Sequence, residues 1–247
     1  MPATPAWPPQ STPRLFVAGP LAVGLRTIDG AQAHYLAGVM RIRPGDPVKL
    51  FDGDNGEWLA IAREVGRKTL VVELTQQLRT TEAVPDLWLC AAPLKKGRID
   101  WLAEKACELG VAQLVPVITA RTIVDRLNGE RLYAHMVEAA EQCGRTAVPA
   151  LAEPVKLAAL LRDWGDRHLF FADETGGAPA AATMAARPGP AAILIGPEGG
   201  FTPEEREAIR RVPQAVGIGL GPRILRADTA AAAAVALWMA SAGDWRL

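Results

Sequence analysis

The sequence ILIGPEGGFTPEE, at residues 193–205, contains the features from which we infer the fold. Its apolar run is followed by a loop with three glycines in residues 196–200. Thr202 then precedes Pro203, and Glu205 stands three positions after the threonine, which is the pattern of a helix N-terminus closed by a capping box. The stretch therefore predicts a buried strand, a glycine-rich loop and a helix that begins at Thr202.

The three glycines of this loop need a physical explanation. Three glycines in five residues cost backbone entropy unless a positive φ or the close approach of another group requires them. We therefore expect another group against this backbone. A phosphate-binding loop is disfavoured, because no Lys-Ser or Lys-Thr pair follows, and the later glycines at 217, 219 and 221 lead into Pro222 instead of completing a dinucleotide fingerprint.

Strand-like and helical patterns alternate on both sides of this stretch. Such alternation is typical of a parallel sheet covered by helices, with a ligand at the carboxyl ends of the strands. Apolar runs predict strands at 87–92, 111–117, 168–172, 191–196 and 215–221, and apolar spacing predicts helices at 99–109, 130–143 and 228–242.

The first third of the chain has a different pattern. Short alternating runs between Leu15 and Leu78 are separated by turn sequences such as RPGD and DGDNG. They predict a small β-barrel-like domain over residues 14–78, which leaves residues 79–247 for the α/β domain. The Pro-rich residues 1–13 lack the basic start and leucine-rich core of a secretory signal, so we interpret them as an unstructured lead-in.

Composition narrows the class of protein further. The 247 residues include 27 basic and 27 acidic side chains, so a polyanionic partner would have to meet a local patch of charge. The longest apolar stretch is too short to span a membrane, and we expect a soluble, cytoplasmic protein. Three widely spaced cysteines suit neither a disulfide framework nor a metal site, and we expect all of them to be buried thiols: Cys90, Cys107 and Cys143.

A second glycine-containing stretch, GLGPRILRADTA at residues 219–230, lies near the end of the chain. A strand, a turn and a helix capped by Asp228 would account for most of it. This interpretation does not explain Arg223 and Arg226. Both arginines stand beside a glycine-lined loop. Basic groups at that place suit an anionic substrate.

Together, LIGPEGGFTPEE and LGPRILRADTA resemble the paired signature of the RsmE family, the bacterial 16S rRNA (uracil-N3)-methyltransferases of the SPOUT superfamily. HYLAGVMRIRPGDPVKLFDG resembles the N-terminal PUA-like domain of that family. KKGRIDWLAEKACELGV, ITARTIV and EAAEQCGRTAVPAL resemble successive segments of its catalytic domain. The chain departs from the family pattern at Asp228, where Glu is usual, and at Cys143, where a small polar residue is common.

The resemblance implies a knotted (trefoil) parallel-sheet methyltransferase domain preceded by a PUA-like β-barrel. It also implies a homodimer whose pocket is completed across the subunit interface, with no metal. Its cofactor would be S-adenosylmethionine, held largely by backbone groups of three loops that follow strands. The cofactor-binding residues predicted from these loops are Ala172, Glu174, Ile195, Gly196, Pro197, Gly199, Gly200, Ile218, Leu220, Gly221, Ile224 and Leu225.

Methylation of uracil N3 requires alignment of the base and loss of the imide proton. Arg226 and Arg223 are predicted to stabilise the negative charge that develops on the uracil carbonyl oxygens. Glu198 is the third predicted catalytic residue, with Glu174 and Asp228 as alternative proton acceptors. None of the three histidines is chosen as a base: His34, His135 and His168.

The implied substrate is 16S rRNA within the 30S subunit, with a target base that is unstacked or unpaired. A non-catalytic RNA-binding protein would have no use for both glycine loops, and a nucleotide-dependent oxidoreductase would need the dinucleotide fingerprint that is missing. Basic side chains of both domains are predicted to contact the phosphate backbone: Arg41, Arg43, Lys95, Lys96, Arg98, Arg121 and Arg145.

Overall fold

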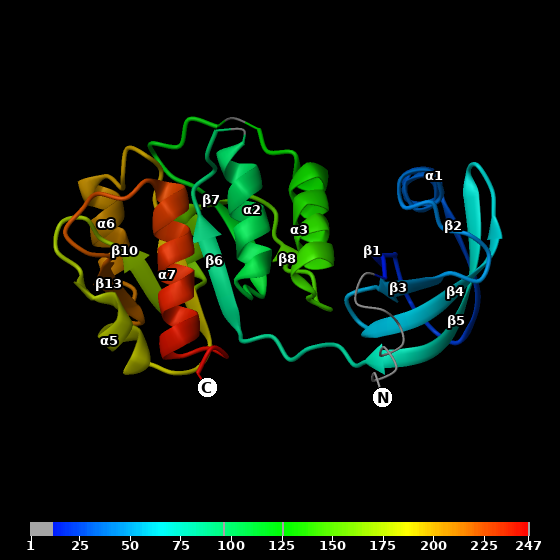
Figure 1. Ribbon diagram of the computed structural model, residues 1–247. Helices are drawn as coiled ribbons and strands as arrows, with labels where there is room; N and C mark the ends of the chain where they lie inside the picture. Colours follow the sequence, from blue (N-terminus) through cyan, green and yellow to red (C-terminus); the bar gives the residue numbers. More distant parts are fainter. Residues whose placement is uncertain (1–11, 96, 125, 247) are drawn as a thin grey trace. The chain divides into compact units, whose positions relative to one another are not determined.

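The computed structural model describes residues 12–95, 97–124 and 126–246. The chain divides into two compact units (Figure 1). The first unit extends to Ala83 and includes the segment Ala140–Ala147. The second unit consists of Val84–Ala139 and of Val148 onward.

A five-stranded sheet forms the first unit, in the order β1-β3-β4-β5-β2. The β1 strand is parallel to β3, and the other neighbours are antiparallel. The DGDNG turn lies between β3 and β4 as predicted, and the Asp52 carboxylate accepts the backbone N–H of Asn55 at 2.7 Å. The strands are β1 (Arg14–Phe16), β2 (Gly24–Asp29), β3 (Pro47–Phe51), β4 (Glu57–Val65) and β5 (Thr69–Arg79).

Two short helical elements between β2 and β3 were not predicted from the sequence pattern. They are α1 (Gly30–His34) and the π-helix η1 (Tyr35–Val39). The backbone N–H of Met40 donates to the carbonyl of Tyr35 at 3.0 Å, five residues earlier, as in a π-helix. Ala33 and Leu36 are fully buried in the core of this unit, so each element packs one side chain into it.

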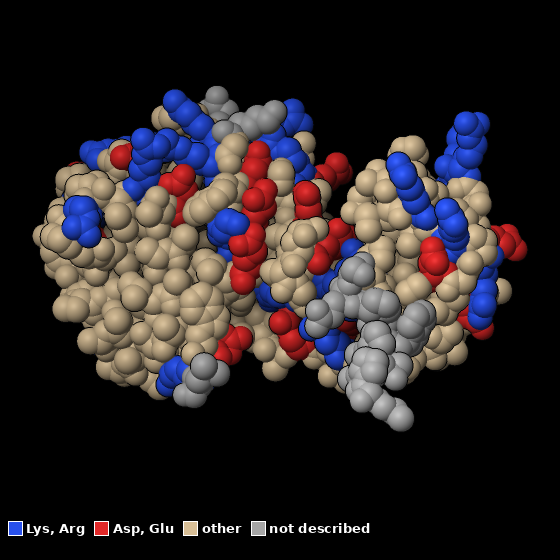
Figure 2. Space-filling model, in the orientation of Figure 1, with Lys and Arg blue, Asp and Glu red and all other residues tan. Residues whose placement is uncertain are grey.

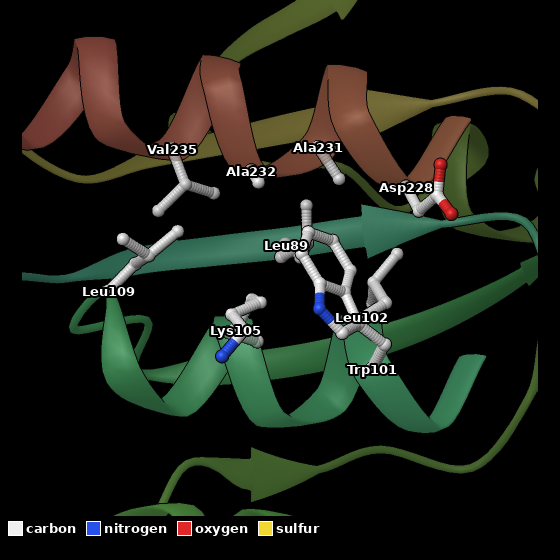
Figure 3. Close-up of a pocket in the computed structure, with 10 residues that line it drawn as sticks. Leu89, Trp101, Leu102, Lys105, Leu109, Asp228, Ala231, Ala232 and Val235 are labelled. Atoms are coloured by element: carbon white, nitrogen blue, oxygen red, sulfur yellow. The ribbon is translucent and has the colours of Figure 1, made fainter. Parts of the chain in front are cut away.

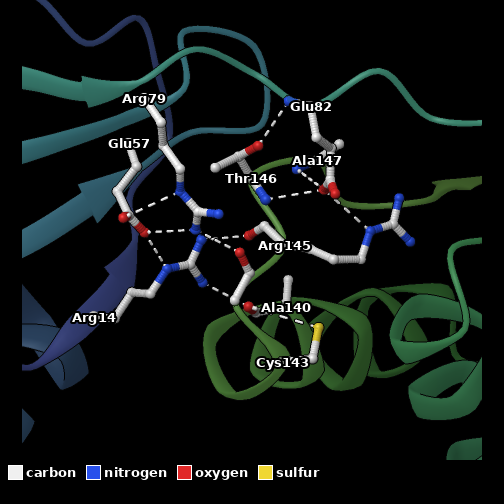
Figure 4. Close-up of polar contacts among 10 residues, drawn as sticks. Arg14, Glu57, Arg79, Glu82, Ala140, Cys143, Arg145, Thr146 and Ala147 are labelled. Carbon is white, nitrogen blue, oxygen red and sulfur yellow. Dashed lines mark hydrogen bonds and ion pairs between the residues drawn. The ribbon is translucent and has the colours of Figure 1, made fainter. Parts of the chain in front are cut away.

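A polar cluster ties the segment Ala140–Ala147 to the strands of the first unit (Figure 4). Glu57 of β4 accepts hydrogen bonds from Arg14 and Arg79. Arg14 also donates to the carbonyl oxygen of Ala140 at 2.5 Å. The burial of Glu57 raises the pKa of its carboxyl, but the hydrogen bonds and positive charges of the two arginines lower this pKa more, so the net shift is downward.

The second unit is built on a parallel sheet in the order β11-β13-β10-β12-β6-β7-β8, with β9 (Val155–Lys156) paired to β7. Every strand pair in it is parallel, which confirms the predicted fold class. The trefoil knot stays a prediction. The strands on the main path are β6 (Leu87–Ala91), β7 (Gln113–Ile118), β8 (Ala150–Leu151), β10 (His168–Ala172), β11 (Ala178–Pro179), β12 (Ala191–Ile195) and β13 (Ala215–Gly219).

Helices cover both faces of this sheet. Figure 1 shows α2 and α7 beside each other across one face, and α7 also contacts α5. On the other face, Phe171 and Leu194 of the strands pack with Ile209 of α6 in one core cluster. The helices are α2 (Arg98–Glu108), α3 (Gly129–Cys143), α4 (Leu157–Arg162), α5 (Ala180–Ala185), α6 (Pro203–Arg210) and α7 (Ala227–Ser241). In the described part of the chain, none is long and apolar enough to cross a membrane.

Helix α6 begins as the sequence predicts. Thr202 is its N-cap residue, and the Thr202 hydroxyl accepts the backbone N–H of Glu205 at 3.2 Å. In return, the Glu205 carboxylate accepts the backbone N–H of Thr202 at 2.9 Å. The capping box is therefore confirmed, and it fixes the exit of the glycine-rich loop.

Two local predictions, by contrast, are wrong. Asp228 does not cap α7, because Arg226 occupies the N-cap position and Asp228 lies in the first turn. Cys143 is exposed rather than buried, whereas Cys90 and Cys107 are buried. Burial raises the pKa of the Cys90 thiol to about 12, so this side chain is a neutral part of the core.

Candidate active site

A cavity of about 720 Å³ lies among the loops that follow β10, β12 and β13 of the second unit. The three predicted catalytic residues, Arg226, Glu198 and Arg223, all line it. The same cavity is lined by all the predicted cofactor-binding residues: Ala172, Glu174, Ile195, Gly196, Pro197, Gly199, Gly200, Ile218, Leu220, Gly221, Ile224 and Leu225.

The glycines of the loop after β12 are explained by other side chains of the protein. A Cβ atom at Gly196 would lie 3.1 Å from the ring of Phe201. Gly200 has a φ of +68°, and a Cβ atom there would lie 2.6 Å from Oε1 of Glu174. The groups that were expected to lie against this backbone thus include two side chains of the protein itself, Phe201 and Glu174. Their close approach to the glycines shapes one wall of the cavity.

Arg121 joins a fourth loop to this wall. It follows β7, and its guanidinium Nη1 donates to the carbonyl oxygen of Gly199 at 2.5 Å. The predicted contact of Arg121 with RNA phosphate stays a prediction. The side chain is exposed to solvent.

Asp173 also lines the cavity and was not predicted from the sequence, although its neighbours Ala172 and Glu174 were. Its side chain is only 3% exposed and accepts a hydrogen bond from Arg210 at 2.6 Å. Burial raises the pKa of this carboxyl, but hydrogen bonds from Thr175 and from Arg210 lower the pKa more, so Asp173 is ionised at neutral pH. An acid directly after a buried strand was the available signal.

Glu198 and Asp228 share one arginine. Arg98 Nη1 lies 3.3 Å from Glu198 Oε1, and Arg98 Nε lies 3.9 Å from Asp228 Oδ2. Glu198 lines the cavity, whereas Asp228 lines a narrow groove between α2 and α7 (Figure 3). Arg98, predicted as an RNA contact, thus pairs with two acids near the cavity.

Arg223 and Arg226 differ from the other arginines around the cavity. Both side chains are exposed on the loop between β13 and α7. Within residues 12–95, 97–124 and 126–246, neither guanidinium makes an ion pair or a hydrogen bond. The two positive charges are therefore available to an anionic ligand, and their role in binding one stays a prediction.

The remaining predicted RNA contacts lie in several places. Arg41 and Arg43 are exposed in the first unit, and Lys95 is exposed in the second. Arg145 is buried, and its Nε lies 3.2 Å from Glu82 Oε1, a position that does not suit a phosphate contact. Lys96 lies outside the described residues.

The charged surface of the second unit is uneven. Figure 2 shows Lys and Arg side chains gathered along its upper edge, over the ends of α2 and α6, while the face over α5 and α7 carries few charges. In the part of the chain that the structure describes, no group of His, Cys, Asp and Glu side chains could hold a metal ion.

Comparison with known proteins gives matches over both units. Residues 81–239 match the family model of an RNA methyltransferase domain, and residues 28–75 match that of an RNA methyltransferase PUA domain. The ribosomal RNA small subunit methyltransferase E of Rickettsia conorii is 31% identical, over 82% of this chain and 84% of that protein. The protein of the same name from Bacillus subtilis is 30% identical, over 83% of this chain and 85% of that protein.

Solved structures agree with these matches. The ribosomal RNA small subunit methyltransferase E of Neisseria gonorrhoeae, bound to S-adenosylmethionine, superposes with a TM-score of 0.86 and 26% identity over 95% of this chain and 99% of that chain. A methyltransferase from Legionella pneumophila, in complex with the same cofactor, gives a TM-score of 0.83 and 29% identity over 94% of this chain and 98% of that chain.

Proposed function

Because the chain belongs to the RNA methyltransferase family of the ribosomal RNA small subunit methyltransferases E, we propose that it methylates N3 of a uridine in 16S rRNA with S-adenosylmethionine as methyl donor. The observation that carries this proposal is the cavity, which is lined by every predicted cofactor-binding residue and every predicted catalytic residue. An oxidoreductase does not fit the family match over residues 81–239.

The cavity suits S-adenosylmethionine in size and chemistry. Its volume of about 720 Å³ falls within the range of small-molecule sites. Ile195, Leu220 and Leu225 give it apolar walls for a purine, and the carboxylates of Glu174 and Glu198 suit a cationic ligand. When bound, the cofactor supplies an electrophilic methyl group on its sulfonium.

Arg226 and Arg223 would act on the RNA. As N3 of the uracil loses its proton, negative charge spreads to the neighbouring carbonyl oxygens, and a guanidinium placed there stabilises it. Both side chains are exposed at the cavity and make no ion pair among the described residues, so neither charge is already neutralised. We propose that Arg226 contributes more to this charge stabilisation than Arg223 does.

Among the three candidate proton acceptors, we favour Glu198. Its carboxylate lines the cavity and is oriented by Arg98 at 3.3 Å. Glu174 is paired with Arg206 and lies over Gly200, and Asp228 lies in the groove between α2 and α7 instead of the cavity. Glu198 is therefore the acid best placed to take the N3 proton.

We also propose that the protein is a homodimer that uses the face of α7. After Thr229 this helix has no charged residue, and its side chains Ala232, Ala236 and Leu237 are only half-buried. Trp101 of α2, 39% exposed, lines the adjoining groove with Ala232 (Figure 3). Such an uncharged, small-residue face suits close contact with the same face of a second copy.

Sedimentation equilibrium tests the dimer. We expect twice the mass of the chain for the wild type and one chain for Ala232→Glu, which introduces a charge on the α7 face. A wild type that sediments as a monomer with full methyl-transfer activity would contradict this part of the proposal.

The reaction itself is tested by transfer of labelled methyl to 30S subunits that lack the modification, with the product located by nucleoside mass spectrometry. Because these subunits are the proposed substrate, we also propose that the protein acts in the cytoplasm. We expect N3-methyluridine in 16S rRNA. A methyl group on another atom would contradict the assigned position. Cofactor binding without any transfer would mean that the RNA substrate or its assembly state is wrong, whereas a wild type that does not bind the cofactor would favour a non-catalytic RNA-binding protein.

A further inference from the structure

Helix α6 connects several of the loops around the cavity. Its first turn ends the loop after β12, and Glu205 Oε1 accepts the backbone N–H of Ala120 in the loop after β7 at 2.7 Å. One turn of α6 also faces the loop after β10, where Arg206 forms an ion pair with Glu174. This helix therefore holds three strand-end loops of the sheet together.

The contact between Arg206 and Glu174 differs from the neighbouring one between Arg210 and Asp173. Asp173 is 3% exposed and Arg210 is 50% exposed, so in that pair the acid is the buried partner. In the other pair the arginine is the buried partner, since Arg206 is 17% exposed and Glu174 is 45% exposed. A mostly enclosed guanidinium thus holds a carboxylate that lines the cavity.

Glu174 is held at one particular place. Its Oε1 lies so near Gly200 that a Cβ atom on this glycine would be 2.6 Å away. Gly200, with its φ of +68°, belongs to the loop after β12. The Glu174 carboxylate, which Arg206 holds, therefore lies where the loop after β10 contacts the loop after β12.

We propose that Arg206 is a positioning residue of the cofactor cavity. Arg206 holds Glu174 over Gly200 and so keeps the loop after β10 closed against the loop after β12. This inference rests on the proposed function, because the cavity is taken as the site of S-adenosylmethionine. Without Arg206, the half-exposed carboxylate gains alternative positions in solvent, and the closed cavity becomes one of several conformations. The apparent affinity then falls in proportion to the closed fraction.

The test compares Arg206→Gln with a matched control on the same helix, Arg211→Gln. Arg211 is 75% exposed, and within the residues that the structure describes its only ion pair is with Glu207 of its own helix. By titration calorimetry we expect the dissociation constant for S-adenosylmethionine to rise about fivefold in Arg206→Gln and to stay unchanged in Arg211→Gln. Arg206→Lys should recover part of the affinity, because it keeps the charge but loses the planar fork.

Kinetics separate positioning from chemistry. The KM for S-adenosylmethionine should rise with the dissociation constant, while kcat at saturating cofactor and RNA stays within about twofold of the wild type. A fall in kcat with an unchanged KM would overturn the inference, as would wild-type affinity in Arg206→Gln. Thermal unfolding of each variant checks that it is folded.

A double-variant cycle with Glu174→Gln tests whether Arg206 acts through Glu174. If it does, the double variant binds S-adenosylmethionine no more weakly than the weaker single variant, whereas additive losses would overturn the inference. The proposed function fails separately: it is contradicted if the wild type itself does not bind S-adenosylmethionine, whereas wild-type binding with an unaffected Arg206→Gln overturns only the role of Arg206.

Discussion

Glu57 in the first unit and Glu198 in the second are both carboxylates paired with arginine, but their surroundings differ. Glu57 is 8% exposed and accepts hydrogen bonds from both Arg14 and Arg79. Glu198 is 35% exposed and has one arginine, Arg98, at 3.3 Å. The first carboxylate is enclosed by its partners, and the second still faces a cavity.

This difference indicates where each carboxylate contributes free energy. A buried carboxylate must keep all of its partners, because an unpaired buried charge is costly. Glu57, together with Arg14 and Arg79, therefore contributes to the stability of the first unit. A half-exposed ion pair contributes little to stability, and its open side remains available to a ligand. The two units thus use the same pair of residue types for folding and for function.

The largest effect is expected for Glu57→Gln. Removing the charge leaves Arg14, which is 11% exposed, without its buried partner, and should lower the free energy of unfolding of the first unit by about 3 kcal/mol. Hydrogen exchange of the β4 and β5 amides measures this locally. Glu73→Gln is the matched control, since its pair with Arg63 joins the same strands but is 39% and 50% exposed. Equal losses of stability in both variants would show that burial does not set the contribution of Glu57.

Arg226→Ala should have the next largest effect, and on catalysis alone. Loss of the charge facing the uracil oxygens should lower kcat/KM by about a hundredfold, or about 2.7 kcal/mol. The melting temperature should not change, because the side chain is exposed. Arg162→Ala, whose guanidinium is 74% exposed near Asp163, serves as control; an Arg226 variant as active as that control contradicts the assignment.

Asp173→Asn should lower the free energy of unfolding by about 1.5 kcal/mol at pH 7, because the Arg210 hydrogen bond loses its charged acceptor. The pKa of Asp173 in the folded chain lies below its ordinary value of 3.8, so its stabilisation is complete above that value and is lost as pH falls through the folded-state pKa. Denaturant unfolding at a series of pH values should show the difference from wild type shrinking in acid. A difference that grows in acid would refute this.

The smallest effect on stability is expected for Glu198→Gln. Because the pair with Arg98 is 35% exposed on each side, the free energy of unfolding should change by less than about 0.5 kcal/mol. The unfolding free energies of this variant and of Glu57→Gln, measured side by side, compare the two carboxylates directly. A loss of stability as large as that of Glu57→Gln would mean that the Glu198 carboxylate is structural.

Local chemistry explains what could be predicted from the sequence. Thr202 and Glu205 form the expected capping box because both partners lie within one helical turn. The cavity residues could be named because the motifs of three strand-end loops resemble those of a known family, and such loops meet at one edge of a parallel sheet. Short-range patterns therefore predicted the strands and the long helices, whereas the cavity residues came from the family resemblance.

Long-range contacts explain what could not be predicted. Arg14 donates to the carbonyl of Ala140, 126 positions away, and no periodicity connects the two. The exposure of Cys143 and the burial of Arg145 both depend on the placement of the segment Ala140–Ala147 in the first unit. The π-helix was missed because its bonds to the fifth residue leave no distinct apolar spacing in a five-residue element.

The central claim is that the cavity of the second unit is the site of S-adenosylmethionine. The most direct test is titration calorimetry of this cofactor with the wild type, with Leu220→Trp, which fills the cavity, and with Val39→Trp, a control at a 62% exposed position of the first unit. We predict one site per chain in the wild type and the control, and a loss of affinity of about tenfold or more in Leu220→Trp. Binding to Leu220→Trp as tight as to the wild type would contradict the claim.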